Sequence, residues 1–456
     1  GTAPTPMARL QPDALNPGVR RREVFGWAMY DFANSGYTTV VLTAVFAAYF
    51  VGGVAGGAPW ATFAWTATLA ASSALVMLTM PALGAWADLR AAKKRALAVS
   101  TVGCVLCTAG LALVGPGDLW LAVAFVLLSN LFFSWGDALI AAFLPELARP
   151  ASLGKVSGWG WSFGYLGGML TLGLSLAWVL SAQARGETAS QFVPVTMAIT
   201  AVVYALAAIT TFVLLRERAV PQPQAAAQGA GLGEMGAALS RLARTWRQAR
   251  QFRDFNALLA CGLAYQAGIS VVIALAAVYA EQAMGFQQTE TMMLIFLVNI
   301  AAAVGAFAWG HVQDRIGHRA ALAATLVGWI VMVALAVAAT GPALFWVAAV
   351  LAGLCMGSSQ SAGRALTGAL APVAQRAEFF GLWTFATRLA AIVGPLTYGA
   401  VTWATAGNHR LAIGCTGVFF VIGLWLLMRV DVARGETAAQ TADRLRAAPG
   451  AGGRGG

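Results

Sequence analysis

Unbroken apolar runs of about 20 residues recur along nearly the whole chain. A helix rises about 1.5 Å per residue, so a run of this length crosses the ~30 Å hydrocarbon core of a bilayer. Only 10% of the 456 residues are charged, whereas soluble domains carry roughly a quarter. The runs at 40–50 and 198–215 lack the alternating polarity of transmembrane barrel strands. The sequence therefore predicts an all-α polytopic membrane protein.

Twelve membrane spans are expected from these runs. A long polar stretch, 216–253, follows the sixth span and separates two six-helix bundles at 25–215 and 254–429, with tails at 1–24 and 430–456. The expected spans are 25–50, 60–87, 95–114, 119–144, 156–180, 192–215, 254–280, 291–312, 320–340, 343–366, 379–405 and 410–429.

The basic residues predict the orientation of these spans. With the N-terminus inside, Arg185 and Arg410 are the only Lys or Arg residues placed outside, and Arg364 and Arg388 the only ones placed within spans. This agrees with the positive-inside rule. We expect an integral protein of the inner (plasma) membrane with both termini cytoplasmic. The net charge of +11 then reflects orientation, and no nucleic-acid partner is expected.

The stretch between the bundles has one helical segment with an apolar and a basic face. Two interpretations are open: an amphipathic helix bound to anionic lipid of the inner leaflet, or a solvated connector. The apolar face would hold Met235, Leu239, Leu242 and Trp246, and the basic residues are Arg241, Arg244, Arg247 and Arg250.

A loop motif occurs once in each half. Gly84 precedes Asp88 by four residues at the end of span two, and Gly310 precedes Asp314 identically at the end of span eight. The glycine permits close helix approach, and the carboxylate can bind a neighbouring helix end or a basic residue. We expect the two aspartates, with Arg90 and Arg315, to form a gating clasp that locks one conformation and releases in another.

The two motif copies resemble the major facilitator superfamily, and the resemblance extends over 23–430. Segments at 30–37, 144–146, 154–168 and 377–382 are further similar to its vacuole-effluxer branch. The resemblance implies a secondary transporter of two pseudo-symmetric six-helix bundles that works by alternating access. It also implies an amino-acid-like substrate, because fungal members of that branch export amino acids from the vacuole.

Charged residues within spans are the main candidates for a binding site, since each costs roughly 2.5–3.5 kcal/mol at a helix centre. Asp31 shares the first span with Asn34 and Tyr37. We expect these three to bind a substrate ammonium or a coupling proton, with a structural carboxylate as the alternative. Arg388 lies deep in span eleven, where its planar guanidinium suits a substrate carboxylate. The alternative is an arginine bound to structural acceptors.

Asp137 and Arg364 lie at related positions of spans four and ten. We expect them to approach each other when the inner gate closes, although Arg364 is also near enough to the interface to snorkel. Further polar residues within spans are predicted to line the substrate cavity. These are Asn130, Ser134, Tyr265, Gln266 and Asn299.

The predicted function is secondary active transport of a small polar or zwitterionic solute, in the export direction and coupled to protons. A proton-linked exporter of amphipathic or drug-like molecules and a non-transporting membrane sensor are the alternatives. His311, His318 and His409 lack metal-ligand spacing, and the chain has no phosphate-binding loop or nucleophile motif. We therefore expect no enzyme activity, cofactor or metal.

Overall fold

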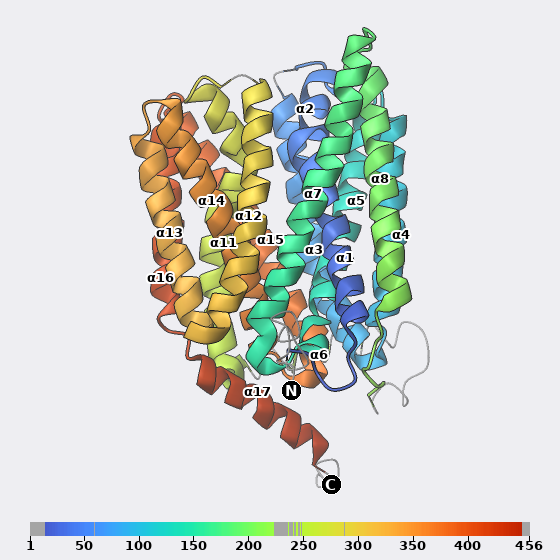
Figure 1. Cartoon of the computed structure of the whole chain (residues 1–456), viewed down its shortest axis with the longest axis vertical. Coiled ribbons are helices and arrows are strands. Elements are labelled where there is room, and N and C mark those ends of the chain that lie inside the picture. The colour runs from blue at the N-terminus through green and yellow to red at the C-terminus, as the bar shows by residue number, and fades with distance from the viewer. Residues whose placement is uncertain are drawn as a thin grey trace, which may run out of the picture.

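The computed structural model describes residues 14–58, 60–222, 236, 240, 243–244, 247, 249–286 and 288–448. The predicted apolar face of the linker, which begins at Met235, lies outside these residues. The regular secondary structure of the described residues is helical, with one isolated β-bridge between Leu15 and Ala148. It forms two bundles that stand side by side with their helices along the long axis (Figure 1).

The bounds of the helices follow the predicted spans closely. The first bundle contains α1 (Arg21–Tyr37), α2 (Phe46–Tyr49), α3 (Ala61–Arg90), α4 (Lys93–Gly110), α5 (Leu119–Ala141), α6 (Leu144–Leu147), α7 (Leu153–Ala184) and α8 (Ala189–Leu214). The second contains α11 (Arg253–Gln282), α12 (Gln288–Ile316), α13 (His318–Ala338), α14 (Pro342–Leu370), α15 (Arg376–Ala404) and α16 (His409–Leu427), followed by α17 (Val432–Ala447).

Eleven helices in the described residues are long and apolar enough to cross a membrane. The first expected span differs, because α1 gives way to π-helical turns at Thr38–Ala44 and Phe50–Val54 with α2 between them. Four consecutive β-branched residues begin at Thr38 and two glycines occupy 52–53, and both features weaken a regular helix. This interrupted segment is the remaining crossing of the twelve-helix, two-bundle fold.

Each bundle has its own apolar core. Trp27 and Tyr204 are fully or almost fully buried in the first core, and Trp329 stacks on Phe420 at 5.0 Å in the second. Both ends of the described chain lie at the same end of the molecule (Figure 1). We call it the termini end; it also carries the loops around Asp88 and Asp314.

The most extensive contacts between the bundles are made by two equivalent helix pairs, α7 with α12 and α3 with α15. The glycines of the repeated motif lie in these contacts. A Cβ on Gly84 would stand 2.5 Å from the carbonyl oxygen of Ala377, and one on Gly310 would stand 2.6 Å from that of Gly154. Only a residue without a side chain fits at either position, so the motif glycines allow the two backbones to touch.

The two chain ends are partly structured, where the sequence predicted only tails. Asn16 Nδ2 donates to the carbonyl oxygens of Pro145 and Glu146, at 3.0 and 2.9 Å. At the other end, Arg434 on α17 donates twice to the carboxylate of Asp254, at 2.8 Å each. Each end is thus attached to its own bundle.

The bundle contact predicts different effects for two glycines on α7. A Cβ on Gly158 would collide with the carbonyl oxygen of Ala306 and lie 3.1 Å from Gly310 Cα, whereas Gly173 has nothing within 4 Å. Both Gly→Ala changes gain the same helix propensity. We expect Gly158→Ala to lower the thermal unfolding temperature in detergent, consistent with an overpacking cost of about 1–3 kcal/mol. Gly173→Ala should keep or raise it. Equal unfolding temperatures would contradict this account of the interface.

Candidate functional site

Four charged side chains meet between the bundles. Asp31 on α1 and Asp137 on α5 come from the first bundle, and Arg364 on α14 and Arg388 on α15 come from the second. The charge of Asp137 interacts with both arginines and with Asp31. Each bundle therefore presents one sign of charge to the other, and the cluster is neutral as a whole.

Asp31 and Arg364 form a buried ion pair across the interface. Nη1 of Arg364 lies 2.6 Å from Oδ2 of Asp31, and the two side chains are 6% and 7% exposed. The rest of the guanidinium is also bound, because Nε donates to Ser157 Oγ at 3.1 Å and Nη2 donates to the Ser157 carbonyl at 2.7 Å. All three guanidinium nitrogens thus have an acceptor on the first bundle.

Aromatic rings enclose this guanidinium. The Cζ atom of Arg364 lies 4.6 Å from the ring centroid of Trp27 and 5.2 Å from that of Trp161. Two faces of the cation are therefore covered by π-systems, which stabilise a desolvated cation. Removing one member of such a pair typically costs 3–5 kcal/mol, since the other charge stays buried without a partner.

The ion pair differs from the predicted pairing of Arg364 with Asp137. Arg364 is buried, so it does not snorkel, and its salt-bridge partner is Asp31. Asp31 in turn has a counter-ion that was not expected. The reason is the direction of the side chain: α14 packs against α7, and Ser157 on α7 fixes the guanidinium beside α1. Sequence position gives the depth of Arg364 in the membrane but not this direction.

Asp137 and Arg388 are arranged differently. Within the described part of the chain, no ion pair of 4.0 Å or less joins them. Asp137 accepts one long hydrogen bond from Asn34 Nδ2, at 3.4 Å. The guanidinium of Arg388 lies over the ring of Phe133 at 5.9 Å, and among the described residues its buried Nε has no acceptor. Both side chains are half-buried.

A hydrogen-bonded chain in the first bundle positions Asn34. Tyr204 donates to Asn34 Oδ1 at 2.8 Å, and its hydroxyl lies 3.2 Å from that of Tyr30. Tyr37 bonds to Ser129 at 2.7 Å, and its ring stacks on Phe133 at 5.0 Å. Asn34 and Tyr37 therefore belong to a preorganised wall beside Asp137.

Four of the five other predicted cavity residues form hydrogen bonds within their own bundle. Ser134 and Asn299 donate to carbonyls of their own helices, at 2.7 and 3.1 Å. Asn130 donates to Ser72 at 3.0 Å, and Gln266 donates to Gln360 at 2.8 Å. Tyr265 is fully buried, with its ring centroid 6.4 Å from that of Trp383. Their role in lining the substrate cavity stays a prediction.

Several residues that complete the site were missed from the sequence. Tyr204, Ser157 and Phe133 lie in apolar spans, where nothing in the residue pattern separates them from packing residues. The residue pattern likewise does not separate Trp27 and Trp161 from packing residues. A weak signal existed for Tyr204, since a tyrosine in the middle of a span must place its hydroxyl against a partner.

The two motif aspartates cap helices of the opposite bundle. Asp314 accepts from the amides of Gly154 and Lys155, at 3.0 and 2.8 Å. Asp88 accepts from the amides of Ala377 and Glu378, at 3.1 and 2.8 Å. In each case the amides belong to the second and third residues of the helix, α7 or α15. A carboxylate there satisfies two unpaired donors and complements the helix dipole.

Arg90 and Arg315, expected in the same clasp, lie beside these caps. Arg90 is the last residue of α3 and is half-buried, whereas Arg315 is exposed near the end of α12. Asp314 accepts hydrogen bonds from backbone amides rather than from the neighbouring arginine. Because the helix holds its backbone amides in place, the donors of this clasp vary less in position than the side chains of a loop would.

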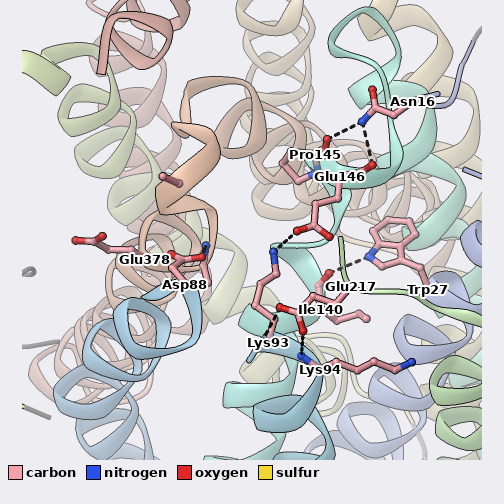
Figure 2. Close-up of polar contacts among 12 residues, drawn as sticks. Asn16, Trp27, Asp88, Lys93, Lys94, Ile140, Pro145, Glu146, Glu217 and Glu378 are labelled. Atoms are coloured by element: carbon pink, nitrogen blue, oxygen red, sulfur yellow. Dashed lines mark hydrogen bonds and ion pairs between the residues drawn. The ribbon is translucent and has the colours of Figure 1, made fainter. Parts of the chain in front are cut away.

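A second polar cluster fixes the termini end of the first bundle (Figure 2). Lys93 Nζ forms a buried ion pair with Glu146, and the carboxylate of Glu217 accepts from the amides of Lys93 and Lys94 at 3.0 and 3.1 Å. Burial raises the pKa of Glu217, while the Lys94 amide opposes that shift. Glu217 thus ties the start of the linker to the start of α4.

The symmetric caps predict selective effects of two substitutions. Asp88→Asn should increase the rate of amide hydrogen exchange in the first turn of α15, whereas Asp314→Asn should do so in the first turn of α7. An Asn side chain keeps one acceptor oxygen but loses the charge, so we expect each rate to rise about 5- to 10-fold, the equivalent of about 1 kcal/mol. Hydrogen exchange with mass spectrometry measures both turns together. Equal changes in both turns, or none, would contradict the assignment.

The family comparison covers most of the chain. The family model described as "Vacuole effluxer Atg22 like" matches residues 60–440. The uncharacterized MFS-type transporter YxiO of Bacillus subtilis is 27% identical over 430 residues, which are 92% of this chain and 97% of that protein. Autophagy-related protein 22-1 of Aspergillus niger is 28% identical over 236 residues, which are 48% of this chain and only 38% of that protein.

Solved structures share the fold at low identity. The human organic anion transporter MFSD10 has a TM-score of 0.68 at 16% identity, covering 89% of this chain and 99% of its own. A bacterial homologue of the iron transporter ferroportin in an outward-facing state has a TM-score of 0.66 at 15% identity, covering 90% and 99%. The solved structures share the fold of this chain, and the family match and the MFS-type relative of nearly full length make it a membrane transporter rather than an enzyme. It belongs to the Atg22-like vacuole effluxer family, within the major facilitator superfamily.

Proposed function

We propose that the protein is a secondary active transporter that exports a small zwitterionic solute of the amino-acid class by alternating access, coupled to protons. The observation that carries this proposal is the four-charge cluster. One pair of opposite charges, Asp31 and Arg364, is closed across the bundle interface, while the other, Asp137 and Arg388, is not. A gate needs a pair of charges that closes across the interface, and a solute site needs a pair that is left open for the ligand.

The position of the interface bonds supports alternating access. The caps made by Asp88 and Asp314 join the bundles at the termini end. Each is a discrete contact that either forms or breaks, because a carboxylate bonds to two helix amides at once. The positive-inside pattern makes this end cytoplasmic in our proposal, so the described conformation is closed to the cytoplasm and faces outward.

The chemistry of Asp31 supports proton coupling. Protonation would remove the anion that holds Arg364, and the guanidinium would stay buried against Ser157 without a counter-ion. Leaving one such charge unpaired is strongly unfavourable. A proton on Asp31 therefore favours separation of the bundles, which is the opening of the cytoplasmic gate.

Other features support the remaining parts of the proposal. The family description, "Vacuole effluxer", supports export as the direction. We place the protein in the plasma membrane with both termini cytoplasmic, and the basic linker on anionic lipid of the inner leaflet. The alternative substrate class, amphipathic or drug-like molecules, has less support, because such molecules need no matched pair of opposite charges.

Reconstituted protein tests the proposed function. In proteoliposomes with an imposed pH gradient, the wild type should accumulate radiolabelled L-amino acids against their gradient. Asp31→Asn should abolish this accumulation but retain exchange of labelled for unlabelled solute, since the carboxyl that carries the proton is gone. Asp118→Asn is the matched control, because Asp118 lies in an exposed loop.

Two results would count against the proposal. Proton-driven accumulation by Asp31→Asn at the wild-type rate would remove Asp31 from coupling. No flux of any amino acid through well-folded wild-type protein would favour the other substrate class or a non-transporting sensor.

A further inference from the structure

The side chains of Asp137 and Arg388 lean toward each other along the membrane normal. The helices α5 and α15 are in contact and run in opposite directions, since α5 ends and α15 begins at the termini end. Side chains on a helix tilt toward its N-terminus. Asp137, four residues before the end of α5, therefore tilts away from the termini end, and Arg388, in the middle of α15, tilts toward it.

The contacts of Arg388 place it close to the Asp137 side of α5. Its guanidinium lies over the ring of Phe133, which is one helical turn before Asp137. The two charges interact electrostatically. They face each other across the interface, yet N···O distances of 4.0 Å or less are absent between them in the described chain.

This arrangement contrasts with the neighbouring ion pair. Arg364 uses all three of its guanidinium nitrogens, whereas the Nε of Arg388 has no acceptor among the described residues. The one hydrogen bond of Asp137 is long, although Tyr204 holds the donor Asn34 in place. Two opposite charges at membrane depth without close partners are expensive. A ligand with one charge of each sign would satisfy both.

We propose that Asp137 binds the ammonium group of a zwitterionic solute whose carboxylate binds Arg388. This inference rests on the proposed function and corrects the sequence-based roles, in which Asp31 received the ammonium and Asp137 closed the gate. The planar guanidinium fork binds a carboxylate in two places, and Asn34 adds a polar group beside the ammonium.

The placement has a consequence for selectivity. Asp137 belongs to the first bundle and Arg388 to the second, so a zwitterion bridges the bundles. A carboxylic acid without an amino group would bind Arg388 alone and leave Asp137 unpaired. Only a ligand with both charges then draws the two bundles together, which makes zwitterion recognition part of the conformational change.

Binding measurements on purified protein test the role of Asp137. The proteinogenic L-amino acids are titrated one by one against the wild type, and each binder is compared with its analogue that lacks the α-amino group. Asp137→Asn should weaken binding of the amino acid at least 10-fold and leave binding of the analogue within about 2-fold. Arg388→Lys should weaken both, because it keeps the charge but loses the fork. Asp118→Asn, at the start of the same helix, should change neither.

The outcomes separate this inference from the proposed function. Asp137→Asn protein that binds the amino acid as the wild type does would overturn the inference alone. An equal loss for amino acid and analogue would also overturn it, because Asp137 would then act only by shaping the site. Asp137→Ser repeats the test if the Asn variant elutes as aggregate. Failure of the wild type to bind any amino acid would overturn the proposed substrate class and the inference together.

Discussion

The buried ion pair between Asp31 and Arg364 is the interaction on which the rest of the interface depends. It lies where an uncompensated charge is most costly, and it joins helices from different bundles. Ser157 and two tryptophans complete the surroundings of the guanidinium. The pair therefore has two favourable states. In one, the two side chains form the ion pair, and in the other the bundles are apart and each charge has another partner. At intermediate separations, at least one charge has neither its ion-pair partner nor another partner.

The carboxylate contacts to backbone amides at the termini end likewise join one bundle to the other through a charged group. Asp88 and Asp314 cap helices of the opposite bundle at equivalent positions, and the motif glycines bring those helix starts within reach. Two-fold pseudo-symmetry explains why the motif occurs twice: the α7–α12 and α3–α15 contacts are the same contact with the bundles exchanged. In the proposed alternating-access cycle, opening of the termini end separates both contacts.

Residue patterns predict the depth and spacing of these groups but not their directions. The twelve spans follow from apolar run length, and the two bundles follow from the long polar stretch at 216–253 and the repeated loop motif. Arg364 was assigned to Asp137 because both lie at related depths, and the actual partner, Asp31, depends on how α14 rotates against α7. Tyr204 and Ser157 resemble packing residues until their hydrogen bonds are seen. The π-helical turns of the first span were missed because their β-branched and glycine residues are also common in regular membrane helices.

The most direct test of the lock is a distance measurement across the termini end. Spin labels at residues 95 and 373, in a variant whose native cysteines are replaced, report the separation of the bundles by double electron–electron resonance. Both positions are exposed. If the Asp31–Arg364 pair holds this end closed, Asp31→Asn shifts the distance distribution to longer values, and Asp118→Asn leaves it unchanged. A distribution for Asp31→Asn that matches the wild type, in folded protein, would contradict the account.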